Sequence, residues 1–335
     1  MSMTVLRPGL LTSIQDLGRV GFQKYGVIMS GAMDSYAHRV ANLLVGNEEA
    51  EAALEITLTG PSVEIEEDLL LAITGGELSP TIDSYPIPLW KPVYVKKGSV
   101  LQFGPCKSGC RAYLAVAGGF RVEKVMGSAS TYLRAGIGGY FGRTLEAGDV
   151  LAVKAPSEHA VQLMEQLAKR GDKYFSTTSW SVQTERVVPE EKITTIRVTR
   201  GTHYEQFTEQ ARTAFFDQVF NVSPQSDRMG YRLSGDPLEL TQSFEVISEA
   251  VSLGTIQVPS NGQPIILLAD RQTTGGYPRI GQVITVDISL LAQAKPGGSI
   301  QFKEVSMQEA EALYVNREMD LLELRAGIAL KMTEM

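Results

Sequence analysis

Two segments of the sequence are dense in side chains that can bind a small polar ligand without forming a run of charge. The first comprises residues 13–19 and 30–34, and the second comprises residues 257–264 and 269–278. Their amide, hydroxyl and guanidinium groups can donate hydrogen bonds to a carboxylate, a carbonyl or a ureido group. The candidate ligand-binding residues are Gln15, Asp16, Ser30, Gly31 and Asp34 in the first segment, and Gln257, Asp270, Arg271, Gln272, Thr273, Thr274 and Tyr277 in the second.

Arg271 is the preferred ligand-binding residue of this set. Asp270 and Arg271 directly follow the apolar segment 264–269, and loops at the ends of strands commonly carry functional side chains. An arginine can hold a carboxylate through two hydrogen bonds, so we expect Arg271 to bind the carboxylate or ureido-like carbonyl of a substrate. The alternative is a polar turn in which Asp270 and Arg271 only satisfy backbone groups.

Familiar cofactor motifs are missing from the sequence. Gly104–Gly109 has the glycine spacing of a phosphate-binding loop, but Cys110 stands where that motif needs lysine. The glycines at 136–139 lack the third glycine of a dinucleotide fingerprint, because Phe141 occupies its place. Cys106 and Cys110 have no second pair of ligands nearby, so we expect small, buried or idle thiols rather than a zinc site.

The three histidines do not form a recognisable catalytic pattern. His38, His159 and His203 are scattered, and each is expected to be a surface or helix residue. Triads assemble in space rather than in sequence, but no nucleophile motif supports a Ser-His-Asp site. We therefore assign no catalytic residue, no nucleotide-binding residue and no metal ligand.

The C-terminal sequence Ala329–Met332 is similar to the Ala-Met-Lys-Met attachment site of biotinyl carrier domains. In those domains the lysine lies on a hairpin in the middle of a compact domain, whereas Lys331 lies close to the end of this chain. Terminal residues are commonly frayed. We therefore expect a frayed tail at Lys331, and no covalently bound cofactor.

The composition indicates a folded protein of about two domains. The chain has 335 residues, of which 43% are hydrophobic and 21% charged, and its net charge is −7. Nucleic acids and anionic membranes bind basic surfaces, so neither is expected as a partner. The sequence has no apolar run of ~20 residues, no secretion signal and only two cysteines, which leads us to expect a cytoplasmic protein.

Strand signals dominate the predicted secondary structure. Short apolar segments bounded by Gly, Pro, Asn or Asp predict strands at 62–65, 69–74, 93–95, 100–103, 111–116, 195–199, 244–248, 264–269, 283–287 and 299–302. Helical periodicity is confined to 33–45, 158–170, 204–220 and 306–324. Regular alternation of strands and helices is missing, so the prediction is a mainly β (α+β) fold.

A weak internal repeat indicates two copies of one unit. Four matches recur in the same order at nearly constant spacing: 25–31 with 229–235, Glu55 with Glu249, 69–72 with 266–269, and 95–103 with 294–302. The predicted domains are 1–155 and 193–305, with a helix and linker at 156–192 and a C-terminal helix and tail at 306–335. Ligand sites often form where domains meet, so we expect the two polar segments to face each other across a cleft.

The polar segments also carry a resemblance to a known family. Residues 12–19, 26–34, 42–47, 226–233, 254–259 and 270–278 look like motifs of the biotin-dependent carboxyltransferase family, which includes allophanate hydrolase subunit 2 and the carboxyltransferase region of urea carboxylase. The resemblance extends over essentially the whole chain and adds Arg228 to the candidate site. Within the family, the length and details are most similar to the KipA-type proteins of bacilli, also described as the C subunit of a 5-oxoprolinase.

This resemblance implies two tandem cyclophilin-like β-barrel domains with a few flanking helices. It also implies a protein that is inactive alone and forms one enzyme with two other proteins, one KipI-like and one LamB/YcsF-like. The implied complex uses ATP to cleave a lactam, 5-oxo-L-proline, to L-glutamate. Where ATP binds in that complex does not follow from the sequence.

Two alternative functions remain open at this stage. The first is a KipA-type regulator that binds a KipI-type inhibitor and relieves inhibition of a sporulation histidine kinase. The second is carboxyl transfer from carboxybiotin, as in urea carboxylase. The carrier and carboxylase domains of that enzyme have no counterpart in this sequence.

Overall fold

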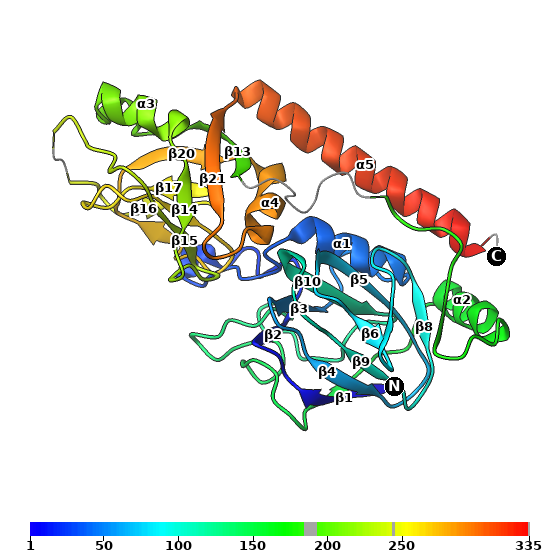
Figure 1. The fold of residues 1–335 in the computed structure, drawn as a ribbon. Coiled ribbons are helices and arrows are strands. Elements are labelled where there is room, and N and C mark those ends of the chain that lie inside the picture. The colour runs from blue at the N-terminus through cyan, green and yellow to red at the C-terminus, as the bar shows by residue number, and fades with distance from the viewer. Residues whose placement is uncertain (184–192, 243–244, 334–335) are drawn as a thin grey trace. The chain divides into compact units, whose positions relative to one another are not determined.

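The computed structural model describes residues 1–183, 193–242 and 245–333, and it divides the chain into two units (Figure 1). Unit 1 comprises Met1–Arg19, Asp34–Val188 and Asp320–Met335, and unit 2 comprises Val20–Met33 and Pro189–Met319. The N-terminal segment Val20–Met33 therefore belongs to unit 2, although the sequence placed it in the first domain. The predicted linker extends past residue 183, and its residues 184–192 lie outside the described part.

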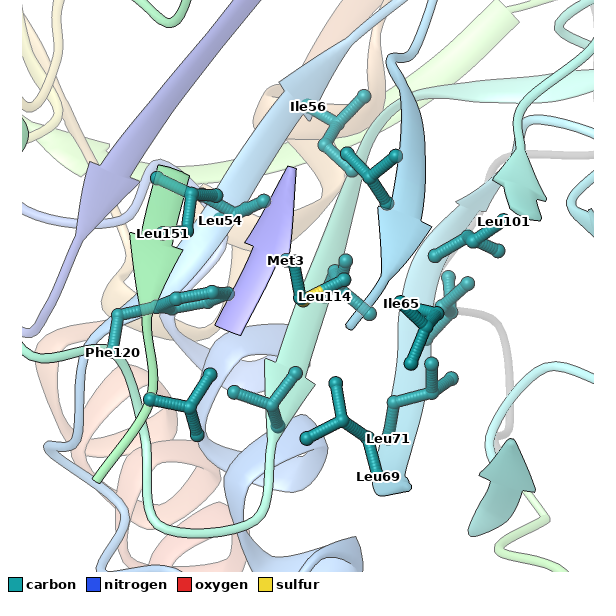
Figure 2. Close-up of a cluster of buried hydrophobic side chains, with 14 of the residues drawn as sticks. Met3, Leu54, Ile56, Ile65, Leu69, Leu71, Leu101, Leu114, Phe120 and Leu151 are labelled. Carbon is teal, nitrogen blue, oxygen red and sulfur yellow. The ribbon is translucent and has the colours of Figure 1, made fainter. Parts of the chain in front are cut away.

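Unit 1 is built from two six-stranded antiparallel sheets. In the first sheet the strand order is β11 (Val150–Ala152), β1 (Ser2–Arg7), β4 (Ser62–Ile65), β9 (Val100–Gln102), β6 (Thr81–Ile82), β7 (Tyr85–Pro86). In the second the order is β12 (Phe175–Thr177), β8 (Val93–Val95), β5 (Leu69–Glu77), β10 (Ser108–Val116), β3 (Ala53–Thr57), β2 (Leu11–Gln15). Both sheets contribute fully buried side chains to one hydrophobic core, including Met3, Leu54, Leu71, Leu101 and Leu114 (Figure 2).

Helices explain why the central strands of unit 1 read as unbroken apolar runs. Strand β5 is buried at every residue from Leu69 to Gly76, and helix α1 (Ser35–Leu44) packs against β5 and β10. A strand covered on both faces cannot alternate with polar residues. Helix α2 (Glu158–Lys169) is capped by Ser157, as the sequence predicted, and packs near β5, β8 and β12.

Unit 2 contains a closed seven-stranded barrel. The strand order is β13 (Ile193–Arg200), β20 (Arg279–Val283), β17 (Thr255–Gln257), β18 (Ile265–Leu267), β15 (Gly230–Ser234), β14 (Phe220–Val222), β21 (Ser299–Glu304). The parallel pairing of β21 with β13 closes the ring. Unit 2 also contains helices α3 (Glu209–Asp217) and α4 (Ile288–Gln293), the 3₁₀ turns η1 (Gln23–Tyr25), η2 (Tyr204–Gln206) and η3 (Thr285–Asp287), and the ribbon of β16 (Glu249–Ala250) and β19 (Thr274–Gly275).

The mainly β class is confirmed, and several predicted elements need correction. The predicted strand 283–287 is wrong, because the chain leaves β20 and forms the 3₁₀ turn η3. The predicted helix 204–220 is interrupted at Phe207, whose backbone forms a bridge with Leu240. Thr208 then caps the separate helix α3.

The C-terminal helix is longer than predicted. Helix α5 runs from Met307 to Thr333, so the sequence Ala329–Met332 is helical and neither a frayed tail nor a hairpin. In the part that belongs to unit 1, Leu321, Ile328 and Met332 are buried on one face. Across the described residues, no helix combines the length and apolarity needed to cross a membrane.

At one of the matched pairs, 95–103 with 294–302, the two segments of the internal repeat share the same local backbone structure. Gly98 and Gly297 both have φ near 82°, and their amides donate to the carbonyls of Ile65 and Val222, each at 2.7 Å. The match of 25–31 with 229–235 is not structural, because the first segment contains a 3₁₀ turn and a loop, whereas the second contains strand β15.

Candidate functional site

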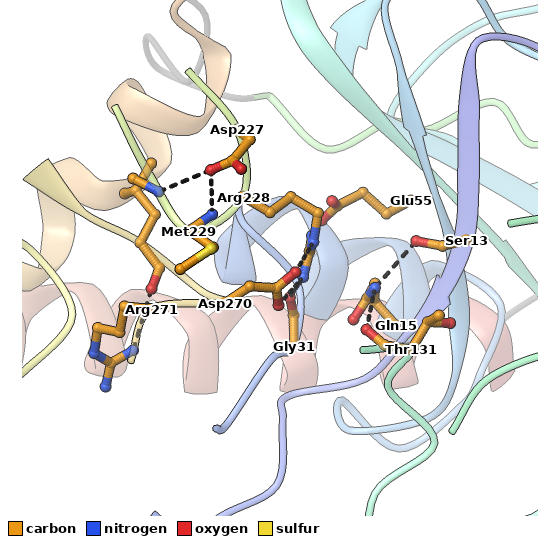
Figure 3. A network of polar contacts seen from close by, with 12 residues as sticks. Ser13, Gln15, Gly31, Glu55, Thr131, Asp227, Arg228, Met229, Asp270 and Arg271 are labelled. Atoms are coloured by element: carbon orange, nitrogen blue, oxygen red, sulfur yellow. Dashed lines mark hydrogen bonds and ion pairs between the residues drawn. The ribbon is translucent and has the colours of Figure 1, made fainter. Parts of the chain in front are cut away.

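A buried ion pair lies at the centre of the predicted site in unit 2 (Figure 3). The guanidinium of Arg228 binds the carboxylate of Asp270 through Nε at 3.0 Å and Nη2 at 3.2 Å, and both side chains are only 7% exposed. The backbone N–H of Asp270 also donates to the carbonyl of Arg228. Arg228 Nη2 donates to the carbonyl of Gly31 at 2.6 Å, which brings residues from three predicted motifs together.

Arg271 is held beside this ion pair but has no acidic partner among the described residues. Its Nη1 donates to the carbonyl of Leu268 at 3.3 Å, and its Nη2 contacts the sulfur of Met29 at 3.7 Å. Its Nε is buried and has no hydrogen-bond partner. Burial lowers the pKa of the guanidinium from its usual value, because no neighbouring carboxylate offsets the loss of water.

The turn at Ser30 and Gly31 has an unusual backbone. Ser30 has φ of 54° and Gly31 has φ of 94°, and a left-handed conformation is costly for a residue with a Cβ. The Ser30 hydroxyl is buried with no partner. Strain and unsatisfied polar groups of this kind are concentrated at ligand sites. The ligand-binding role expected of Ser30 and Gly31 stays a prediction.

Gln257 adds a third unsatisfied donor to unit 2. Its side chain is 5% exposed, and its Nε2 has no partner. It packs against Gly275, where an added Cβ would lie 2.5 Å from that nitrogen, so a larger residue there would displace the amide.

The remaining candidates of the second segment lie in varied settings. Gln272 and Thr274 are exposed, and the carbonyl of Thr273 accepts a backbone hydrogen bond from Val251. Tyr277 is 50% exposed and lines a hollow of about 770 Å³ together with Pro259 and other residues, but not with Arg271.

In unit 1, Asp16 is fully engaged inside the fold. Its carboxylate accepts hydrogen bonds from the hydroxyls of Ser128 and Ser130 at 2.7 and 2.5 Å and from the amides of Ala129 and Gly18 at 2.6 and 2.8 Å. Burial raises its pKa, but these hydrogen bonds outweigh burial and hold the pKa below its usual value. We therefore assign Asp16 to bracing the loop at residues 128–131 rather than to ligand binding.

Gln15 and Asp34 also have partners within unit 1. Gln15 donates to Ser13 and to the carbonyl of Thr131, while its Oε1 is buried without a partner (Figure 3). The Asp34 carboxylate accepts from the amide of Ala37 and caps helix α1. The predicted approach of Gln15 and Asp16 to the second segment stays a prediction.

Sequence reasoning missed a buried polar cluster next to helix α1. The hydroxyl of Tyr113 donates to Glu55 at 2.7 Å and accepts from the amide of Asp34 at 2.8 Å, and the side chains of Tyr113 and Glu55 are fully buried. The ring of His38 meets Tyr113 edge-on. His38 lies on helix α1, one of the two settings expected for it, but the helix buries it completely. No motif signals this cluster, because its members come from separate elements.

Neither cysteine is joined in a disulfide. Cys110 is buried in strand β10 and Cys106 is half-buried. The thiol of Cys106 donates to the carbonyl of Gly109 at 3.2 Å, so it is engaged by its own loop.

The chemistry available in the unit 2 cluster is binding rather than proton transfer. Its carboxylate, Asp270, is neutralised by Arg228, and its unsatisfied groups are a guanidinium N–H of Arg271 and the hydroxyl of Ser30. Such groups recognise a carboxylate or an amide carbonyl.

Comparison with known proteins agrees with this description. The family model for the carboxyltransferase domain, subdomains A and B, matches residues 25–304. The chain is 37% identical to the C subunit of 5-oxoprolinase from Haemophilus influenzae, covering 93% of this chain and 94% of that protein. It is 39% identical to the C subunit of 5-oxoprolinase from Escherichia coli, covering 92% of this chain and 93% of that protein.

The crystal structure of Kluyveromyces lactis urea amidolyase contains a region with the same fold. It superposes with a TM-score of 0.83 at 32% identity over 96% of this chain. The chain spans only 20% of that much longer enzyme. The chain belongs to the family of carboxyltransferase domains with subdomains A and B.

Proposed function

We propose that the chain is the C subunit of an ATP-dependent 5-oxoprolinase and acts together with a KipI-like protein and a LamB/YcsF-like protein. Two relatives with the name of this subunit match over more than nine-tenths of both chains. The observation that carries the proposal is the unbalanced charge of Arg271, which can pair with the carboxylate of 5-oxo-L-proline.

The proposed reaction overcomes the poor leaving ability of an amide nitrogen. The terminal phosphoryl group of ATP is transferred to the lactam oxygen, which makes the ring carbon electrophilic, and a water molecule then adds to that carbon. The carbon–nitrogen bond breaks with protonation of the nitrogen, and a second water releases phosphate from the acyl phosphate to leave glutamate. Splitting one difficult step into easier ones is the usual benefit of such an intermediate.

In this scheme the residues of unit 2 bind and orient the substrate. Arg271 holds the substrate carboxylate, while the Arg228–Asp270 pair fixes the loop that presents Arg271 and the turn at Gly31. Orientation of this kind contributes to rate by removing the entropy cost of alignment. We assign neither the ATP site nor the catalytic base to this chain.

Reconstitution tests the proposal directly. The purified chain is mixed with the KipI-like protein, the LamB/YcsF-like protein, ATP and 5-oxo-L-proline, and glutamate is measured. We expect glutamate only when all three proteins and ATP are present. Glutamate formation at the same rate without this chain would contradict the proposal.

Co-purification distinguishes a subunit of a complex from a protein that acts alone. We expect the chain and a KipI-like protein to elute together from a size-exclusion column at micromolar concentration. Separate elution would contradict both the enzymatic reading and the regulatory alternative, since each requires this complex. A complex that forms but makes no glutamate when the LamB/YcsF-like protein is added would favour the regulator.

A further inference from the structure

Unit 2 contains a second polar hollow that shares no residue with the predicted site. It has a volume of about 360 Å³ and lies where strands β13, β17 and β20 meet. Its polar lining side chains are Arg200, Thr202, Ser252, Thr255, Arg279 and Gln282. None of the residues that line it is acidic, so the hollow presents cations and hydroxyls to whatever enters.

Arg279 is the central group of this hollow. Its side chain is 14% exposed, and its outer nitrogen Nη2 pairs with Glu249, which lies outside the lining. Nη1 makes only a long contact of 3.5 Å to the carbonyl of Ala250, and Nε is buried without a partner. An oxyanion in the hollow would offer the guanidinium a stronger acceptor than the long contact to Ala250.

Arg200, the second cation of the hollow, already pairs with carboxylates that lie outside the lining. Arg200 binds Glu304 at 2.6 Å and Glu205 at 3.5 Å, and both carboxylates are exposed and absent from the lining. Exposed ion pairs are weak, so Arg200 can exchange these contacts for a bound anion at little cost. We expect Arg279 to contribute more to binding than Arg200, because its side chain is 14% exposed whereas that of Arg200 is 52% exposed, and water screens the more exposed charge.

The backbone holds these side chains at a fixed separation. A Cβ on Gly201 would lie 2.5 Å from the carbonyl oxygen of Arg279 and 2.7 Å from the amide of Gly281, so glycine permits the close approach of the two strands. The backbone N–H of Arg279 donates to Nδ1 of His203 at 3.2 Å, which also anchors the backbone of this residue.

The hydroxyls add a donor that can turn toward a ligand. Ser252 and Thr255 lie 3.1 Å apart, and both reach the same acceptor, Oε1 of Gln282, at 3.1 and 2.9 Å. The Gln282 amide nitrogen donates to the carbonyls of Leu253 and Val283, which fixes its orientation. Since Thr255 can satisfy that acceptor alone, the Ser252 proton is available to a ligand.

We propose that this hollow binds a small oxyanion, a phosphate or a carboxylate group, through Arg279 and Arg200 with hydroxyl contacts from Ser252 and Thr202. The proposal does not depend on 5-oxoprolinase activity. A phosphate and a carboxylate share the acceptor geometry that a guanidinium recognises, and the experiment distinguishes them.

Calorimetric titration of the full chain tests the proposal, with inorganic phosphate in one arm and acetate in the other. We expect saturable binding in at least one arm, weakened at least tenfold by Arg279→Gln and a few-fold by Ser252→Ala. The matched control is Arg232→Gln, which removes the same charge from an exposed position on β15 outside the lining and should change affinity less than twofold.

Two results would overturn the proposal. One is no saturable heat in either arm. The other is equal weakening by Arg279→Gln and Arg232→Gln, which would indicate a general charge effect. If Arg279→Gln does not fold by circular dichroism, Ser252→Ala and Arg200→Gln serve in its place, and unchanged affinity in both would equally refute the site.

Discussion

An acidic residue and an arginine lie close together in the sequence of both units, at Asp16 and Arg19 in unit 1 and at Asp270 and Arg271 in unit 2. In unit 1 the two side chains bind different groups of the fold. Asp16 accepts four hydrogen bonds, and the wholly buried Arg19 donates to the carbonyls of Val125 and Ser130. In unit 2 a third residue, Arg228, takes the carboxylate, which leaves Arg271 as an unbalanced cation.

This difference distinguishes a charged residue that braces the fold from one that can bind a ligand. A buried charge whose hydrogen bonds are all made within the chain stabilises the fold and offers little to a ligand. A buried cation without a counter-charge slightly destabilises its own unit, and the unit becomes more stable when an anion binds to that cation. The two similar motifs therefore lead to opposite expectations for stability and activity.

The largest effect is expected from Asp16→Asn. The substitution replaces a carboxylate oxygen with an amide group that faces hydrogen-bond donors, so the free energy of unfolding should fall by roughly 3–5 kcal/mol. Urea unfolding measures this loss. Asp236→Asn is the control, because it removes the same charge from an exposed side chain and should change stability by less than about 0.5 kcal/mol. Equal effects would mean that Asp16 does not brace the loop.

The next largest effect is a dependence of stability on pH. It comes from His38, which the sequence did not predict to be buried. Burial lowers the pKa of His38 to about 4, although Asp16 and Glu55 act in the opposite direction. The unfolded chain takes up this proton below its ordinary pKa of about 6.5, whereas the folded chain does not. The contribution of His38 to stability is therefore present above pH ~6.5 and is lost as pH falls toward about 4.

Unfolding in urea at several pH values checks this expectation. Between pH ~6.5 and ~4, the wild-type chain should lose roughly 3 kcal/mol more than His38→Gln, since each pKa unit corresponds to about 1.4 kcal/mol. Carboxylates such as Asp16 titrate in both proteins and cancel in the difference. Parallel stability profiles would show that His38 is protonated in the folded state.

A smaller effect, on activity instead of stability, is expected from Arg271→Ala. Loss of a charge-assisted contact costs about 1.5–3 kcal/mol, so the reconstituted complex should lose roughly ten- to over a hundred-fold in activity. The melting temperature should hardly change, because the cation has no counter-charge to lose. Arg232→Ala is the matched control. A lower melting temperature with unchanged activity per folded molecule would mean that Arg271 only supports its own turn.

Much of the fold could be predicted from the sequence because local and tertiary preferences agree there. Strands β4 and β8 coincide with the predicted segments 62–65 and 93–95, which are apolar and bounded by turn residues. The predicted strand at 283–287 failed for a tertiary reason. The carboxylate of Asp287 is buried and binds the guanidinium and backbone of Arg197, a contact across 90 positions that holds the 3₁₀ turn.

For the site, the sequence identified residue types but not their partners. Ser30, Gln257 and Arg271 were predicted, and all three have unsatisfied buried atoms. The hydrogen bonds of Asp16 could not be predicted, because its partners Ser128 and Ser130 lie more than 110 positions away. The buried cluster of Tyr113, Glu55 and His38 escaped notice for the same reason.

The smallest expected effect tests where the two units are alike. Gly98 and Gly297 occupy the matched turn, each with φ near 82° and with open space where a Cβ would lie, so alanine meets no clash there. The cost of each Gly→Ala change is then only that of a left-handed backbone, about 1–2 kcal/mol. Chemical unfolding should show nearly equal losses, each in the transition of its own unit, and additive losses in the double variant.

Gly327→Ala is the control, because this exposed helical glycine has ordinary φ, and the substitution should stabilise the protein by about 0.5–1 kcal/mol. If only one of the two turn variants loses stability, then the shared sequence does not give the two turns the same energetics. The repeat would then be a similarity of backbone shape alone.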